Sequence, residues 1–304
     1  MEELTRAATD TYEAWSAVGA DRTRRGDFRA ALEAYGRAAE RARIETDPAK
    51  EDGAALNLAM VRIQLGEAKR GEEGLREIFL RTADPRLGFT AAYHLASSLR
   101  KQGRYEKALG YARRAMERAV ALDAPELLAP AHNLLGNLLL NGNYLDEAVE
   151  EYSVALRMWE TQTCDTRYLR AILEENLGYC LLLKKEYDGG RNRILRALAL
   201  AKEVGDRRCR AECLQDLCYA ALLEGNTAEA AVRGEEALAE AAGAGFGDIE
   251  ENCHYLLGEI GSRTGNSERR DRHFGHLQKL HPELPFLEDF LCAVDVTGII
   301  TLKR

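Results

Sequence analysis

Residues 135–155 read LGNLLLNGNYLDEAVEEYSVA, and this stretch decides the fold of the chain. A Leu-Gly pair opens it, a Gly-Asn-Tyr sequence interrupts it, and alanine and tyrosine then recur at helical spacing. Glycine and asparagine between two apolar periodic segments are typical of a break between helices. The small residues Gly136, Ala148 and Ala155 allow two helices to approach closely, and Tyr152 fills the remaining space. The stretch therefore predicts a tightly packed helix pair.

The same pattern recurs along the chain. Its small residue, which often follows a leucine-like residue, falls at Gly19, Ala59, Ala96, Gly136, Gly178, Cys218 and Gly258. The successive spacings are 37 to 42 residues. A period of this length is the signature of stacked helical repeats. We therefore expect about seven helix pairs.

This pattern resembles that of the tetratricopeptide-repeat family. Because each unit is longer than the standard repeat of about 34 residues, it is similar to the long-repeat branch of bacterial peptide-sensing and MalT-like regulators and kinesin light chains. The resemblance covers about residues 10–281 and implies an all-α, right-handed α-solenoid. We expect a solenoid within residues 1–281, with repeats near 10–46, 47–83, 84–122, 123–164, 165–205, 206–246 and 247–281.

Helix boundaries are indicated by two sets of residues. Aspartates recur between the pairs, where a carboxylate accepts from the free N–H groups of a helix start; they are Asp47, Asp84, Asp123, Asp165, Asp206 and Asp248. Glycines recur within the pairs, where a helix ends in a left-handed conformation; they are Gly26, Gly66, Gly103, Gly142, Gly225 and Gly265.

In a tetratricopeptide-like array the first helix of each pair lines the concave surface. Projecting its non-core positions gives a candidate partner-binding set: Asn57, Tyr93, His94, Ser97, Arg100, Asn133, Asn137, Asn176, Tyr179, Gln215, Asp216, Tyr219, Tyr255 and Glu259. Amides both donate and accept, which suits an extended peptide backbone. Tyrosine adds flat apolar area with a polar tip. The set predicts a peptide groove, although asparagine also occurs at such positions for local helix packing.

These features favour a non-enzymatic adaptor or sensor that captures an extended segment of a peptide or protein. The alternative is a self-associating scaffold that assembles a larger complex through its convex face and carboxyl-terminal tail. No phosphate-binding loop, nucleophile elbow, zincin helix or dinucleotide fingerprint occurs in the sequence. We therefore expect no catalytic residue and no cofactor.

Composition narrows the choice of partner and compartment. A net charge of -8 argues against direct binding of nucleic acid or an anionic membrane. The amino-terminal sequence lacks the basic and apolar regions of a signal peptide, and seven scattered cysteines fit a reducing compartment. We expect a cytoplasmic protein. Two candidate groups lack the donor pattern of a metal site, so we expect no metal; they are His273, His276 and His281, and Cys209, Cys213 and Cys218.

The last part of the chain departs from the repeat. Residues 284–292 predict a short amphipathic helix that caps the array, because terminal repeats need a covered end. Residues 294–302 are β-branched and extended in character. Two placements stay open for this segment within the cap and tail region 282–304. It packs as a flap on the last repeat, or it pairs with a second copy of the chain in a homodimer.

Overall fold

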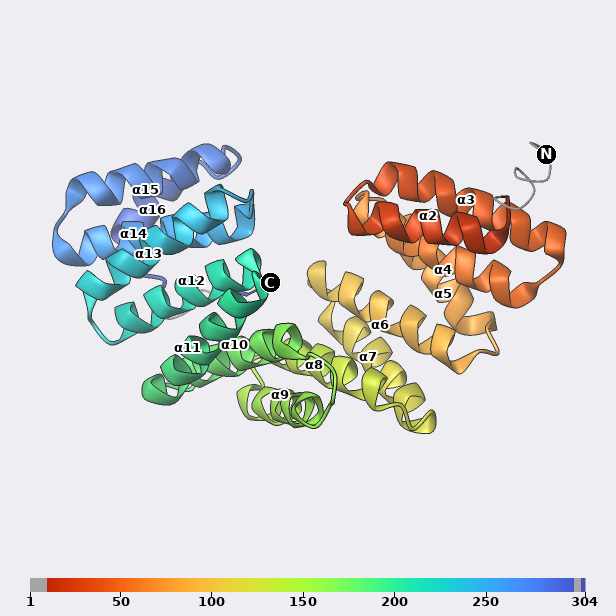
Figure 1. Cartoon of the computed structure of the whole chain (residues 1–304). Coiled ribbons are helices and arrows are strands. Elements are labelled where there is room, and N and C mark those ends of the chain that lie inside the picture. The colour runs from red at the N-terminus through yellow and green to blue at the C-terminus, as the bar shows by residue number, and fades with distance from the viewer. Residues whose placement is uncertain (1–9, 298–301, 304) are drawn as a thin grey trace. The chain divides into compact units, whose positions relative to one another are not determined.

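The computed structural model describes residues 10–297, 302 and 303. All of the regular elements in this part of the chain are helices, so the predicted all-α class is confirmed (Figure 1). The helices are α2 (Tyr12–Arg24), α3 (Phe28–Glu45), α4 (Pro48–Gln64), α5 (Ala68–Arg81), α6 (Pro85–Lys101), α7 (Tyr105–Ala121), α8 (Pro125–Asn141), α9 (Leu145–Glu160), α10 (Arg167–Leu183), α11 (Tyr187–Val204), α12 (Arg207–Leu223), α13 (Thr227–Ala242), α14 (Gly247–Thr264), α15 (Ser267–Leu280) and α16 (Leu287–Ala293). Taken two at a time, α2 to α15 form the expected seven helix pairs.

The chain divides into two compact units, residues 1–138 and 139–304. In the first unit α2 packs on α3, α4 on α5 and α6 on α7, and α4 also contacts both α2 and α6. In the second unit α10 packs on α11, α12 on α13 and α14 on α15, and α12 also contacts both α10 and α14. Within each unit, therefore, the first helices of successive pairs lie side by side in one layer.

The small residues that mark the repeat lie where the two helices of a pair meet. A Cβ atom added to Gly19 would lie 2.6 Å from the ring of Tyr35, and one added to Gly258 would lie 2.3 Å from the ring of Phe274. Ala59 and Ala96 are 1% and 0% exposed. The predicted register of the repeat therefore holds in both units.

Most of the expected boundary residues act as predicted. Asp47, Asp84 and Asp206 accept from backbone N–H groups at the starts of α4, α6 and α12. The predicted glycines have positive φ angles, with the exception of Gly142. After α8 it is the next residue, Asn143, that has the positive φ angle, at 61°. Asparagine tolerates this conformation better than most residues, so the prediction was wrong by one position there.

Two further predictions about helix starts were wrong. Asp123 has a φ of 47° and lies before α8, so it occupies the turn position rather than the cap. Asp248 lies inside the first turn of α14, which begins at Gly247. A carboxylate in a first turn still favours the helix, because it faces the positive end of the helix dipole.

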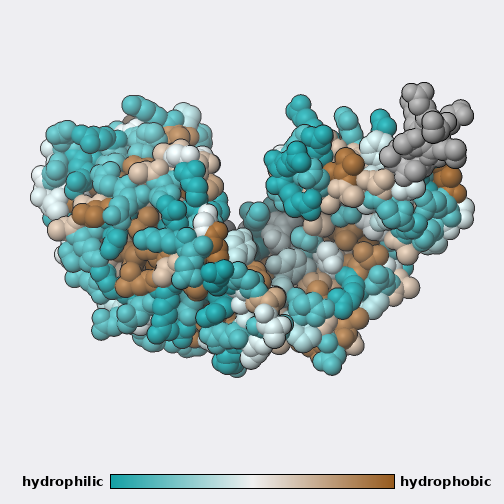
Figure 2. Space-filling view, in the orientation of Figure 1, coloured by the Kyte–Doolittle hydropathy of each residue, from teal (hydrophilic) through white to brown (hydrophobic). Residues whose placement is uncertain are grey.

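The predicted capping helix is present as α16, which packs on α15 and buries Leu291. Residues 298–301, which belong to the predicted extended segment, lie outside the described residues. Hydrophilic side chains cover most of the visible surface of each unit (Figure 2). Among the described helices, none has the length and apolar character needed to cross a lipid bilayer.

Candidate functional site

All of the predicted partner-binding residues lie on first helices of pairs, and they divide between the two units. The first unit holds Asn57, Tyr93, His94, Ser97, Arg100, Asn133 and Asn137. The second unit holds Asn176, Tyr179, Gln215, Asp216, Tyr219, Tyr255 and Glu259. The second group shares the layer formed by α10, α12 and α14, and this layer carries the candidate site.

The site is covered by the end of the chain itself. We use the name tail for residues 294–297, 302 and 303. Tyr219 Oη donates to the carbonyl oxygen of Thr297 at 3.1 Å, and Tyr255 Oη lies 3.0 Å from Thr297 Oγ1. Thr297 is only 2% exposed. Two of the predicted tyrosines therefore hold one residue of the tail by its backbone and its hydroxyl.

Further along, Leu302 is held through both of its backbone polar groups. Its N–H donates to Tyr179 Oη at 3.0 Å, and its carbonyl oxygen accepts from Asn252 Nδ2 at 2.9 Å. Asn252 Nδ2 also donates to Gln215 Oε1 at 3.0 Å, which fixes the orientation of the amide. The Leu302 side chain is buried. The layer thus satisfies the backbone of this residue and removes its apolar side chain from water.

Lys303 brings a positive charge into the layer. Its Nζ donates to Glu175 and lies 3.4 Å from Asp216 Oδ2, while the side chains of Glu175 and Asp216 are 4% and 0% exposed. The ammonium group also lies 5.0 Å from the centre of the Tyr179 ring, within cation–π range. Nζ also donates to Oδ1 of the predicted residue Asn176 at 3.4 Å, and all of these contacts come from α10 and α12. We call Glu175, Tyr179, Asp216, Tyr219, Asn252 and Tyr255 the tail-binding face.

Burial and charge shift the pKa values of these groups in a coherent way. Burial opposes the charge on Lys303, but Asp216, Glu175 and Glu212 outweigh it, and the lysine pKa rises well above its usual range. Burial likewise raises the pKa of Asp216, with Lys303 opposing and Glu175 reinforcing the rise. Burial, followed by the charge of Glu175, raises the pKa of Glu212 to about 7. The surroundings of Lys303 are therefore rich enough in carboxyl groups to keep the lysine charged.

The start of the tail is attached at a second place. Arg263 donates to Glu259 and to Asp295, both at 2.9 Å, and to the carbonyl oxygen of Leu222 at 2.9 Å. Burial raises the pKa of Glu259, and the hydrogen bond from Arg263 opposes the rise. The predicted residue Glu259 therefore contributes to the site through Arg263, which links α14 to the tail.

In the first unit, part of the predicted set is partly buried against the core. Tyr93 stacks on Phe89 with ring centres 5.8 Å apart and contacts the ring of His94 edge-on. Burial lowers the pKa of His94 to about 4, so this histidine is neutral at pH 7. His94 and Ser97 line a cavity of about 360 Å³ together with residues of α4, including Met60. This cavity has a mixed lining and no cluster of charge like that around Lys303.

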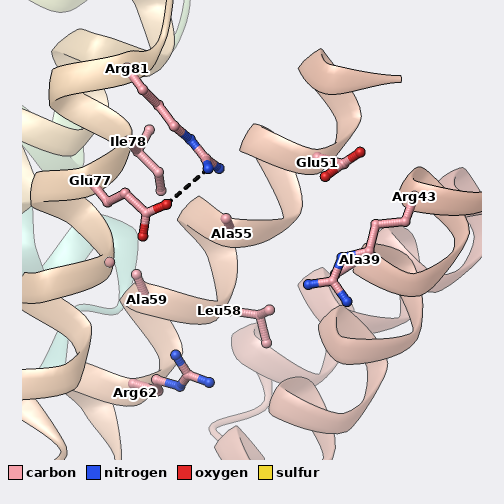
Figure 3. A pocket seen from close by; sticks show the side chains of 11 residues that line it. Ala39, Arg43, Glu51, Ala55, Leu58, Ala59, Arg62, Glu77, Ile78 and Arg81 are labelled. Carbon is pink, nitrogen blue, oxygen red and sulfur yellow. Dashed lines mark hydrogen bonds and ion pairs between the residues drawn. The ribbon is translucent and has the colours of Figure 1, made fainter. Parts of the chain in front are cut away.

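A different cavity of about 290 Å³ lies between α3, α4 and α5 (Figure 3). Arginines from each helix line it, namely Arg43, Arg62 and Arg81. Arg81 is paired with Glu77 at 2.9 Å and with Asp52 at 2.8 Å. None of the predicted partner-binding residues lines this cavity.

The histidines near the end of the chain contact one another. His254 Nδ1 lies 2.9 Å from His273 Nδ1, and the ring of His254 stacks on that of His276 at 3.9 Å. Burial lowers the pKa of both His254 and His273 to about 4. Within the described part of the chain, no group of three or more His, Cys, Asp or Glu side chains is arranged to hold a metal ion.

Sequence reasoning missed three residues that contact the tail, namely Asn252, Asn141 and Arg263. Asn252 lies three residues before Tyr255, and Asn141, which donates to the Lys303 carbonyl oxygen at 3.4 Å, lies four residues after Asn137. These spacings keep a side chain on the same helix face, so extending the register by one turn would have found both. Arg263 carried no such signal, because a charged residue on a helix more often faces solvent.

The fold is shared with solved tetratricopeptide-repeat structures. The apo form of RapI is 14% identical with a TM-score of 0.72, covering 90% of this chain and 98% of RapI. A Rap protein complexed with competence and sporulation factor is 15% identical with a TM-score of 0.66, covering 91% of this chain and 76% of that protein. A tetratricopeptide-repeat protein from Parabacteroides merdae is 19% identical with a TM-score of 0.60, covering 93% of this chain and 99% of that protein.

These similarities confirm the expected tetratricopeptide-like fold. No protein-family model matches this sequence, and no curated protein matches it.

Proposed function

We propose that the chain is a non-enzymatic peptide-binding protein and that its tail-binding face captures an extended segment of a partner. The observation that supports this best is the way the face already holds the tail. Tyr219 and Asn252 donate to tail carbonyl groups, and Tyr179 accepts from a tail N–H group. Side chains that bond to backbone groups accept many sequences, which is the chemistry of peptide recognition.

The fold adds support of a general kind. A Rap protein of the same fold was solved with competence and sporulation factor bound. Solenoids of this class present long first-helix surfaces to their partners, and fold alone does not fix which partner. The polar side chains of α10, α12 and α14 therefore give the specific support for peptide binding.

A tail attached to the same chain competes strongly with any free ligand. Tethering raises the local concentration of an attached segment to about the millimolar range. A partner segment of moderate affinity would therefore bind poorly while the tail is in place. The test of the proposal should remove the tail first.

We would measure binding of a fluorescent peptide spanning residues 294–304 to a chain that ends at residue 293, using fluorescence anisotropy. The expected result is saturable binding that weakens about tenfold or more when Tyr179 and Tyr219 are both changed to phenylalanine, since each change removes one hydrogen bond of about 0.5–1.5 kcal/mol. Tyr168→Phe is the matched control, because Tyr168 lies on α10 but is 52% exposed. Absence of binding by a folded truncated chain would refute the proposal.

A further inference from the structure

We propose that Glu175 and Asp216 form a subsite for a basic side chain, so that the tail-binding face selects segments with an apolar residue followed by lysine or arginine. In the intact chain, Lys303 occupies this subsite and makes the tail a built-in competitor. This inference rests on the proposed function and specifies the class of peptide that the face binds.

The subsite is fixed by the helices and not by the tail. Glu175 is on α10 and Asp216 is on α12, and these two helices are in direct contact. Both carboxyl groups are almost fully buried. Acidic side chains are rarely buried without a partner, because removing a charge from water is costly. A face that keeps two of them side by side is built to receive a cation.

The other buried or half-buried acids of this layer obtain their cations from the helices. Glu174 is paired with Arg193 at 2.9 Å, Glu259 with Arg263 at 2.9 Å, and Glu212 with Arg208 at 3.0 Å. Among the described residues, the cation paired with Glu175 and Asp216 is Lys303 alone. Once the tail leaves, the described helices supply no cation to these two carboxyl groups, and a positive group from another molecule is the natural replacement.

The contacts made by Leu302 indicate which residue type fits immediately before the basic residue. Leu302 is 5% exposed, and its backbone is held on both sides by Tyr179 and Asn252. A segment that places its basic side chain against Asp216 therefore also places the preceding side chain in the space that Leu302 fills. That space favours an apolar residue, because burying a leucine-sized side chain is favourable and burying an unpaired polar one is not.

Arginine suits the subsite at least as well as lysine. Asp216 Oδ2 is buried and accepts no hydrogen bond, and the lysine ammonium lies 3.4 Å from it. A guanidinium carries several N–H donors in a planar fork and can serve two carboxylates at once. A partner segment with arginine at this position would therefore compete well with the lysine of the tail.

The experiment uses the chain ending at residue 293 and peptides spanning residues 294–304 in which position 303 is Lys, Arg, Met or Glu. By fluorescence anisotropy, we expect Lys and Arg peptides to bind with dissociation constants within about threefold of each other, the Met peptide at least about tenfold more weakly, and the Glu peptide at least about a hundredfold more weakly.

The reciprocal variant is Glu175→Gln with Asp216→Asn, which keeps the size of both side chains. We expect it to reduce the preference for Lys over Met to less than about threefold. Glu203→Gln is the control, because Glu203 is an exposed acid paired with Arg167 and should leave the preference unchanged. Helical content is checked by circular dichroism for each variant, and the Lys and Met peptides are compared on the same protein.

The peptide series distinguishes loss of the subsite from loss of peptide binding as a whole. If all four peptides bind equally well, the subsite inference is overturned while peptide binding stands. If a folded truncated chain binds none of them, peptide binding itself is wrong. If the preference for lysine survives in the double variant, the basic side chain is recognised elsewhere and the subsite inference is again overturned.

Discussion

The packing of Gly178 against α11 makes a sharp prediction about stability. A Cβ atom at this position would lie 2.5 Å from Ile194 Cγ1 and 2.9 Å from the carbonyl oxygen of Gly190. The second contact is with backbone, which cannot rotate away as a side chain can. Gly178→Leu must therefore push α10 and α11 apart, and we expect a cost near the upper end of the usual range for overpacking, about 3 kcal/mol.

Gly189 supplies the matched control. It lies one residue before Gly190 on α11, yet a Cβ atom there meets only Leu181 Cδ1 at 3.6 Å, which is ordinary van der Waals contact. Gly189→Leu should leave stability unchanged or raise it by up to about 1 kcal/mol, because glycine inside a helix is unfavourable.

The assay is thermal unfolding followed by circular dichroism at 222 nm. In a unit of this size, about 3 kcal/mol corresponds to a drop in Tm of roughly 6–12 °C. Equal Tm values for the two variants would refute the register that places Gly178 against α11. That register also places the adjacent residue, Tyr179, on the tail-binding face, so the functional proposal depends on it.

Three further predictions address the tail, its charge and a helix start. Lys303→Met in the full chain should increase the affinity for a 294–304 peptide supplied in trans by about tenfold or more, measured by anisotropy, because the tail then competes poorly; an unchanged affinity would show that Lys303 does not hold the tail. Lowering the pH from 8 to 6 should weaken binding of the same peptide to the truncated chain. The pKa of Glu212 is raised to about 7 by burial, and the charges nearby are those of Glu175, Lys303, Arg208 and Asp248. The Glu212 carboxyl is therefore charged above pH 7 and attracts the peptide cation, and it loses this attraction when it is protonated below pH 7. Glu212→Gln should flatten this dependence in calorimetric titrations, and an equally steep dependence would contradict the assignment. Asp206→Ala should cost about 0.5–2 kcal/mol in urea unfolding, since its side chain accepts from two N–H groups of α12 at 3.0 and 3.1 Å; a stability equal to that of the parent would mean that the cap contributes nothing.

Much of this architecture could be predicted because it depends on the spacing of small residues along the sequence. The small residues of the repeat fix which side of each first helix meets its partner, and Gly178 and Gly258 lie where that spacing places them. Once that side is known, the positions next to it follow from helix geometry. For this reason Tyr179, Tyr219 and Tyr255 were expected on one surface, and all three contact the tail.

The occupant of that surface could not be predicted in the same way. Leu302 and Tyr179 are separated by 123 residues, and no periodicity links the two. The β-branched character of the tail suggested a flap on the last repeat or a strand pairing with a second copy. In the structure, Asp295 and Thr297 contact α14 of the last repeat, and Lys303 reaches the earlier helices α10 and α12. Long-range charge pairing of this kind leaves no mark in the local sequence pattern.

The most direct test of the peptide-binding proposal is to map where a peptide touches the truncated chain. A 294–304 peptide with a benzophenone side chain in place of Val296, next to Thr297, would be photo-cross-linked to the chain ending at residue 293 and the attachment site found by mass spectrometry. We predict attachment to α12 or α14, suppressed by excess unlabelled peptide. Attachment confined to residues 10–138, or attachment that excess peptide does not suppress, would contradict the proposal.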